Sequence, residues 1–210
     1  MKIVQAGKEH ERAGSYDNGR RRMANLTKKA LSDALRELLA ARPLDKITVQ
    51  DITDHCGLNR NTFYYHFENT YDLLEWTISQ DADRIMDKCI ETGDVEEAVN
   101  STTSVLQENR DMILNIMSSV ERKRIVDFSY EYFGGQLERL IRELCKKKYE
   151  NPSEAAMKEA IVFCRYSITG SILEWIDQGM KDLPENRVAD LNRMFYNVID
   201  NIGEKSEYAR

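Results

Sequence analysis

Apolar residues recur every three or four positions along most of this chain, a spacing that predicts amphipathic helices. The first stripe, between about Asn25 and Ala41, consists of Leu26, Ala30, Leu31, Ala34, Leu35, Leu38 and Leu39. Two short helices are expected within residues 48–67 and another short one at about 111–117. Longer helices are expected at about 69–91, 96–107, 121–149, 153–179 and 185–202. No segment alternates between apolar and polar residues as a half-buried strand would. The pattern therefore predicts an all-α fold of about nine helices.

The most informative segment runs from Thr48 to Phe67, TVQDITDHCGLNRNTFYYHF. Gly57 offers the left-handed backbone conformation that ends a helix without steric cost. Thr48 and Asp51 form an N-cap and acid pair before the first short helix, and Asn59 is placed to cap the second. Two short helices around a tight turn predict a helix-turn-helix, the second helix of which enters the DNA major groove.

The distribution of charge agrees with this prediction. The whole chain carries a net charge of −6, but residues 1–68 hold 12 Lys and Arg against 9 Asp and Glu. The positive surplus therefore coincides with the predicted helix-turn-helix, where phosphates would bind. We expect a flexible basic tail at residues 1–22, a three-helix DNA-binding domain at 23–68, and a second, helical domain at 69–210.

Several classes of protein are excluded by what the sequence lacks. No apolar run approaches the roughly 20 residues that span a bilayer, and the N-terminus has no apolar signal region. Four scattered cysteines without a CxxC pair favour a cytoplasmic chain with free thiols. Paired-carboxylate, metal-cluster, nucleophile-elbow and phosphate-loop motifs are missing, so we expect no enzyme activity, metal or cofactor.

The segment ITVQDITDHCGLNRNTFYYHFENTYDLL resembles the signature of the TetR-type (tetracycline-repressor-like) transcriptional regulators. The resemblance is strong over about residues 20–80, and the remainder matches only as an all-helical effector domain. It implies that Thr48 contacts a phosphate and that four residues lie nearest the base edges: Asn59, Arg60, Asn61 and Thr62. It further implies phosphate or thymine-methyl contacts for Tyr64, Tyr65 and His66. Members usually carry a Lys where this chain has Thr70, which offers a hydroxyl instead.

Three features allow more than one interpretation. Arg60 either bonds guanine O6 and N7 together or contacts phosphate only. Arg20, Arg21 and Arg22 either enter the minor groove as an arm or attract DNA diffusely. Cys56 is either a redox switch or a small buried residue in place of the alanine usual in the family, and we favour the second.

Aromatic residues are dense in the second domain. Five of them are candidates for lining an effector cavity, although aromatics at helical spacing more often form ordinary core: Tyr130, Phe133, Phe163, Tyr166 and Trp175. The last two helices are too apolar for a monomer surface, so we predict a two-fold homodimer interface through Ser153–Gly179 and Glu185–Ile202.

These features together predict a function. We expect a homodimeric repressor that binds a palindromic operator on double-stranded DNA. The resemblance to the TetR-type regulators further implies that a small-molecule effector releases it. An effector-independent architectural protein and a coregulator-dependent activator are the alternatives.

Overall fold

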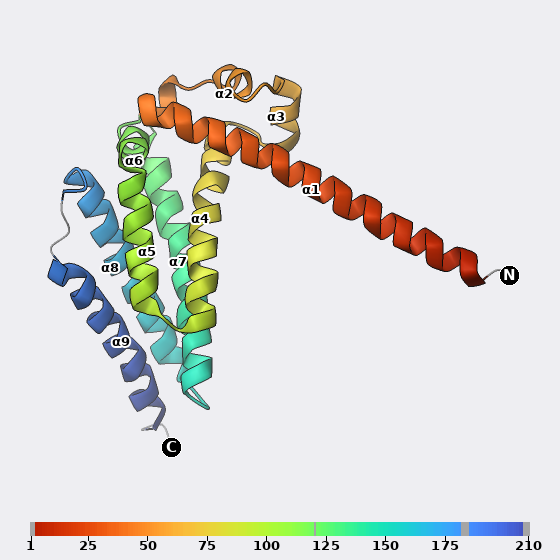
Figure 1. The fold of residues 1–210 in the computed structure, drawn as a ribbon. Helices are drawn as coiled ribbons and strands as arrows, with labels where there is room; N and C mark the ends of the chain where they lie inside the picture. The colour runs from red at the N-terminus through yellow and green to blue at the C-terminus, as the bar shows by residue number, and fades with distance from the viewer. Residues whose placement is uncertain (1–2, 120, 182–184, 208–210) are drawn as a thin grey trace. The chain divides into compact units, whose positions relative to one another are not determined.

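The structure is a computed structural model that describes residues 3–119, 121–181 and 185–207, with side chains at 22–119, 121–181 and 189–202. These residues form one 3-10 turn, Leu44–Lys46, nine α-helices and no strand. Figure 1 labels the helices along the chain. The all-α class and the expected number of helices are confirmed. The helices are α1 Ile3–Ala41, α2 Val49–His55, α3 Arg60–His66, α4 Thr70–Thr92, α5 Val95–Glu108, α6 Arg110–Met117, α7 Arg122–Lys148, α8 Glu154–Asp177 and α9 Glu185–Glu207.

Helix α1 begins far earlier than the sequence pattern indicated. A start near Asn25 was predicted, with a tail before it, but α1 already begins at Ile3. Residues 3–22 lack proline, and half of them are Ala, Gln, Glu, Lys or Arg, which favour helix. An apolar stripe marks only a helix that buries one face, so this polar extension gave no such signal.

Contacts divide the chain into two compact units. The first comprises Met1–Leu38 and Ile47–Trp76, and the second comprises Leu39–Lys46 and Thr77–Arg210. Helices α2 and α3 lie entirely in the first unit. The predicted domain boundary, between residues 68 and 69, lies in the loop before α4. The boundary between the two units lies within α4, after Trp76.

Each of the first four helices contributes fully buried side chains to the first unit. They include Leu31 and Leu35 of α1, Ile52 of α2, Phe63 of α3 and Leu73 of α4. Leu26, on the predicted stripe of α1, is 56% exposed. A stripe shows which face of a helix is apolar, but not how far its neighbours cover that face.

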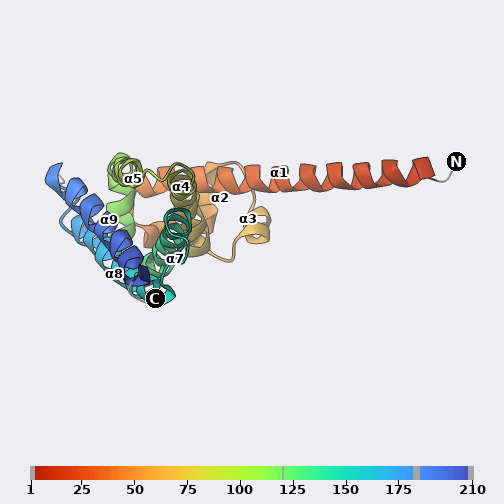
Figure 2. The same cartoon turned by 90° about the horizontal axis from the view of Figure 1, so that it is seen from below.

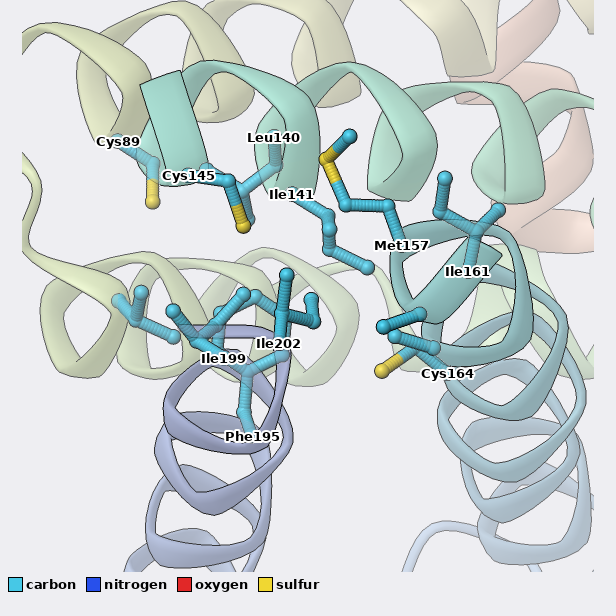
Figure 3. Packing of buried hydrophobic residues seen from close by; sticks show 13 residues of the cluster. Cys89, Leu140, Ile141, Cys145, Met157, Ile161, Cys164, Phe195, Ile199 and Ile202 are labelled. Carbon is cyan, nitrogen blue, oxygen red and sulfur yellow. The ribbon is translucent and has the colours of Figure 1, made fainter. Parts of the chain in front are cut away.

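The core of the second unit draws side chains from α4, α5, α7, α8 and α9. Figure 3 shows them converging between the helices, with Leu140 and Ile141 of α7 facing residues of α8 and α9. Helices α8 and α9 lie side by side in both views (Figures 1 and 2). No helix in the described part of the chain is long and apolar enough to cross a membrane.

Candidate nucleic-acid interface

The start of α2 is fixed by the predicted capping box. Thr48 is extended, and its Oγ1 accepts the backbone N–H of Asp51 at 3.1 Å. The Asp51 carboxylate in turn accepts the N–H of Thr48 at 2.8 Å. The Thr48 side chain is exposed at the helix N-terminus, where the helix dipole also favours an anion.

The turn between α2 and α3 depends on Gly57. Its φ of +68° lies in the left-handed region, where a β-carbon costs roughly 1–2 kcal/mol. The N–H of Leu58 donates to the carbonyl of Thr53 at 2.9 Å and closes the helix end. A Cβ on Gly57 would meet nothing within 4 Å, so backbone conformation rather than space requires glycine here.

Cys56 lies beside this turn and is half-buried. Its Sγ is 3.2 Å from the carbonyl oxygen of Ile52. Burial raises the pKa of the Cys56 thiol, whereas reactive cysteines have a lowered pKa. These observations favour the space-filling interpretation of Cys56 over a redox switch.

Helix α3 is held in place from two directions. Asn59 caps it, with Oδ1 accepting the Thr62 N–H at 2.8 Å and the Thr62 hydroxyl at 3.1 Å. Phe63 is fully buried and Phe67 nearly so, with ring centroids 5.9 Å apart. A seven-residue helix is unstable alone, so the cap and this buried face determine its position.

The opposite face of α3 carries polar and aromatic groups to the surface. Arg60 and Asn61 are exposed, Tyr64 is 50% exposed and Tyr65 is 83% exposed. The Arg60 guanidinium lies 5.9 Å from the Tyr64 ring centroid, and its Nη2 is 3.5 Å from the Tyr64 hydroxyl. Because no carboxylate in the described chain pairs with Arg60, its charge is available to an anion or a base.

The C-terminal end of α3 carries a feature that the sequence analysis missed. His66 is half-buried, and its pKa is lowered by burial and by the charge of Lys28 on α1. The Nζ atom of Lys28 lies 5.5 Å from the ring centroid of Phe67 and 5.7 Å from that of Trp76. No short-range signal links Lys28 to these rings, because the residues are distant in sequence.

Helix α4 is also capped where it follows α3. Asn69 Oδ1 accepts the N–H groups of Tyr71 at 2.9 Å and Asp72 at 3.1 Å. Thr70, the position where the family usually has a Lys, is half-buried in the first turn.

The structure brings most of the predicted DNA contacts into the first unit. Nine of them lie at the start of α2, along α3 or at the start of α4: Thr48, Asn59, Arg60, Asn61, Thr62, Tyr64, Tyr65, His66 and Thr70. Arg22 is exposed on α1, whereas the side chains of Arg20 and Arg21 lie outside the described residues.

The five aromatic candidates for lining an effector cavity lie in different surroundings. Phe163 and Tyr166 are 58% and 61% exposed. The Tyr130 ring lies against that of Tyr166, with centroids 5.5 Å apart and planes tilted by 43°. Trp175 is buried in the core, where its Nε1 donates to the carbonyl of Lys181 at 2.6 Å. Phe133 lies against the neighbouring Tyr132 on α7, with centroids 5.5 Å apart.

A cavity of about 460 Å³ lies instead between α4 and α5 of the second unit. Its polar lining includes Arg84, Lys88, Asp94, Glu97 and Asn100. None of the five aromatic candidates lines it. Apolar spacing could not identify this cavity, because most of the residues that line it are polar and they come from two helices. In the described residues, no group of three or more His, Cys, Asp or Glu side chains could hold a metal ion.

Comparison with protein families gives two matches that together cover most of the chain. Residues 31–76 match the family described as bacterial regulatory proteins, tetR family. Residues 93–197 match the family described as transcriptional regulator C-terminal region. The first match contains α2 and α3 complete, and the second alone spans half of the chain.

Individual relatives are more distant. The HTH-type dhaKLM operon transcriptional activator DhaS of Lactococcus lactis is 32% identical over 56 residues. That stretch is 27% of this chain and 30% of the activator, so the match spans less than a third of that relative.

Solved structures extend the likeness over the whole fold. The dihydroxyacetone kinase operon activator DhaS has a TM-score of 0.64 at 19% identity, over 84% of this chain and 98% of the other. The TetR family repressor AlkX from Dietzia has a TM-score of 0.54 at 18% identity, over 83% and 96%. At such identities these likenesses concern the fold alone.

Proposed function

Because the chain belongs to the TetR family of bacterial transcriptional regulators, we propose that it acts as a homodimeric repressor. In this proposal it binds a palindromic operator and is released by a small-molecule effector. The observation that carries the proposal is the exposed face of α3, where Arg60, Asn61, Tyr64 and Tyr65 are presented by a helix anchored through Phe63. This is the arrangement that a major-groove reading helix needs.

Arg60 is the residue that we propose reads a base. Its guanidinium can donate hydrogen bonds to guanine O6 and N7 at the same time. A good bidentate pair of this kind contributes about 1–3 kcal/mol of discrimination against the wrong base. Arg60→Ala should therefore relax specificity at one base pair in each half-site. An equal loss of affinity for every duplex would instead assign Arg60 to a phosphate.

Exposed apolar side chains on α8 and α9 support the proposed dimer. Large hydrophobic residues are accessible on both helices, at 42–61% exposure: Val162, Phe163, Tyr166, Met194 and Tyr196. Two neighbouring helices with such a surface can form a four-helix interface with a second copy. A two-fold dimer presents two copies of α3, about 34–36 Å apart when they occupy successive major grooves, so its operator is a palindrome.

The cavity between α4 and α5 supports the proposed effector. Its volume falls within the range of small-molecule sites, and its lining suits a polar ligand. Helix α4 lines this cavity and begins in the unit that contains α3. An effector that favours one position of α4 can therefore shift DNA affinity, a coupling typically of about 1–3 kcal/mol.

Selection of bound duplexes from a random pool tests this function directly. We expect a palindrome, with half-sites about one helical turn apart. When the selection is repeated with candidate effectors, less of the palindromic duplex should be recovered if the correct ligand is present. Failure to enrich any sequence would overturn the proposal.

Activation is the second candidate function, because the relative and the solved structure named DhaS are both operon activators. In vitro transcription from a promoter that carries the recovered palindrome separates the two. A repressor lowers transcript yield when it binds, and an activator raises it.

A further inference from the structure

The ammonium group of Lys28 lies against two aromatic rings of the first unit. The distances to the ring centroids of Phe67 and Trp76 are 5.5 and 5.7 Å, and the rings are 5.9 Å apart. Both distances are within the roughly 6 Å at which a ring attracts a cation. The two rings therefore hold the Lys28 side chain in a defined position.

The charge of Lys28 is not compensated by an acid. The next residue, Lys29, forms an exposed ion pair with Asp33, with Nζ and Oδ2 2.5 Å apart. Within the side chains that the structure describes, Lys28 has no carboxylate at ion-pair distance. Its positive charge can therefore attract an anion from outside the protein.

The position of this charge relates it to α3. Phe67 directly follows α3, and the Lys28 ammonium lies 5.5 Å from the centroid of its ring, which places the charge near the C-terminal end of that helix. Arg60 begins the same helix, which at seven residues is about 10 Å long. Cations thus flank α3 at both ends, over a distance comparable with the roughly 12 Å width of the major groove, whose walls carry phosphates.

We propose that Lys28 is a DNA-contacting residue whose ammonium binds a backbone phosphate beside the C-terminal end of α3. The inference rests on the proposed DNA-binding function. Because the two rings already order the side chain, little further freedom is lost when the phosphate binds. A phosphate contact carries no sequence information, so it strengthens binding to every duplex alike.

Salt dependence of DNA binding tests this assignment. Lys28→Met removes the charge and keeps the apolar stem, Lys28→Arg keeps the charge, and Lys29→Met is the matched control beside it. Dissociation constants would be measured by fluorescence anisotropy from 50 to 300 mM KCl, on the selected palindrome and on an unrelated duplex of equal length. Each phosphate that the protein neutralises contributes about 0.9 to the slope of log K against log salt concentration. At 0.1 M salt this contribution corresponds to an about eightfold change in DNA affinity.

We expect Lys28→Met to reduce that slope by about 0.9 and to weaken binding about eightfold on both duplexes. Lys28→Arg and Lys29→Met should keep the wild-type slope. Thermal melting of each variant shows that it is folded, and Lys28→Gln serves as a second neutral variant. Weaker binding with an unchanged slope would make Lys28 purely structural and overturn the proposal. A wild type that binds neither duplex would instead overturn the proposed function, and this inference with it.

Discussion

Replacing Asn59 with alanine removes the acceptor that fixes the start of α3. The lost bonds are those from the Thr62 N–H and the Thr62 hydroxyl, 2.8 and 3.1 Å long. Loss of an N-cap costs about 1 kcal/mol, within a range of roughly 0.5–2. For a chain of 210 residues, about 1 kcal/mol lowers the melting temperature by roughly 2–4 °C. We expect differential scanning calorimetry to show a decrease of that size.

Asn59→Asp is the matched control, because it keeps an acceptor at the same position. Its negative charge at a helix N-terminus is favoured by the helix dipole, so the melting temperature should be unchanged or slightly raised. The same negative charge would be repelled by the DNA phosphates, so affinity for the palindrome should fall, most strongly at low salt. The two variants therefore separate folding from recognition at one position.

Two results would refute this reasoning. An alanine variant that melts with the wild type would show that the Asn59 cap does not stabilise α3. An aspartate variant that binds DNA as tightly as the wild type would place residue 59 away from the phosphates.

Four further substitutions test other parts of the structure. Phe63→Ala removes a fully buried ring and should cost about 3–5 kcal/mol of unfolding free energy in urea titrations. Tyr65→Ala, at a side chain 83% exposed, should cost less than about 0.5 kcal/mol; equal losses would contradict the assigned faces of α3. Folding lowers the pKa of His66, so the unfolded state binds more protons and the wild type should lose stability relative to His66→Gln as the pH falls below about 6.5. Urea midpoints at several pH values check this, and a constant difference between the two proteins would argue against it. Phe163→Glu places a charge on the exposed apolar surface of α8 and α9 and should give monomers in sedimentation velocity at micromolar concentration; an unaltered sedimentation coefficient would locate the interface elsewhere.

The parts of the site that depend on neighbouring residues were predictable from the sequence. The caps at Thr48, Asn59 and Asn69 act over two or three residues, and Gly57 acts through its own backbone. Such interactions need no knowledge of the tertiary fold. They fixed the starts of α2, α3 and α4 and thereby the face that α3 presents.

The parts that depend on long-range packing were not predictable. Lys28 meets Phe67 and Trp76 only after α1, α3 and α4 have come together. On α8, Phe163 is exposed and Trp175 buried although both lie on one apolar helix. When a helix is apolar on two faces, its spacing alone does not distinguish the face that enters the core from the face that can meet a partner.

The cysteines of the second unit make its core accessible to chemical measurement. Cys89, Cys145 and Cys164 come from α4, α7 and α8 and belong to the one buried cluster in Figure 3. Burial raises the pKa of all three, to about 11 for Cys89 and Cys164. Alkylating reagents attack the thiolate, so each site should react mainly when its helix opens. The ratio of each alkylation rate to that of an unfolded thiol then reports the free energy of local opening on three helices, with no introduced label.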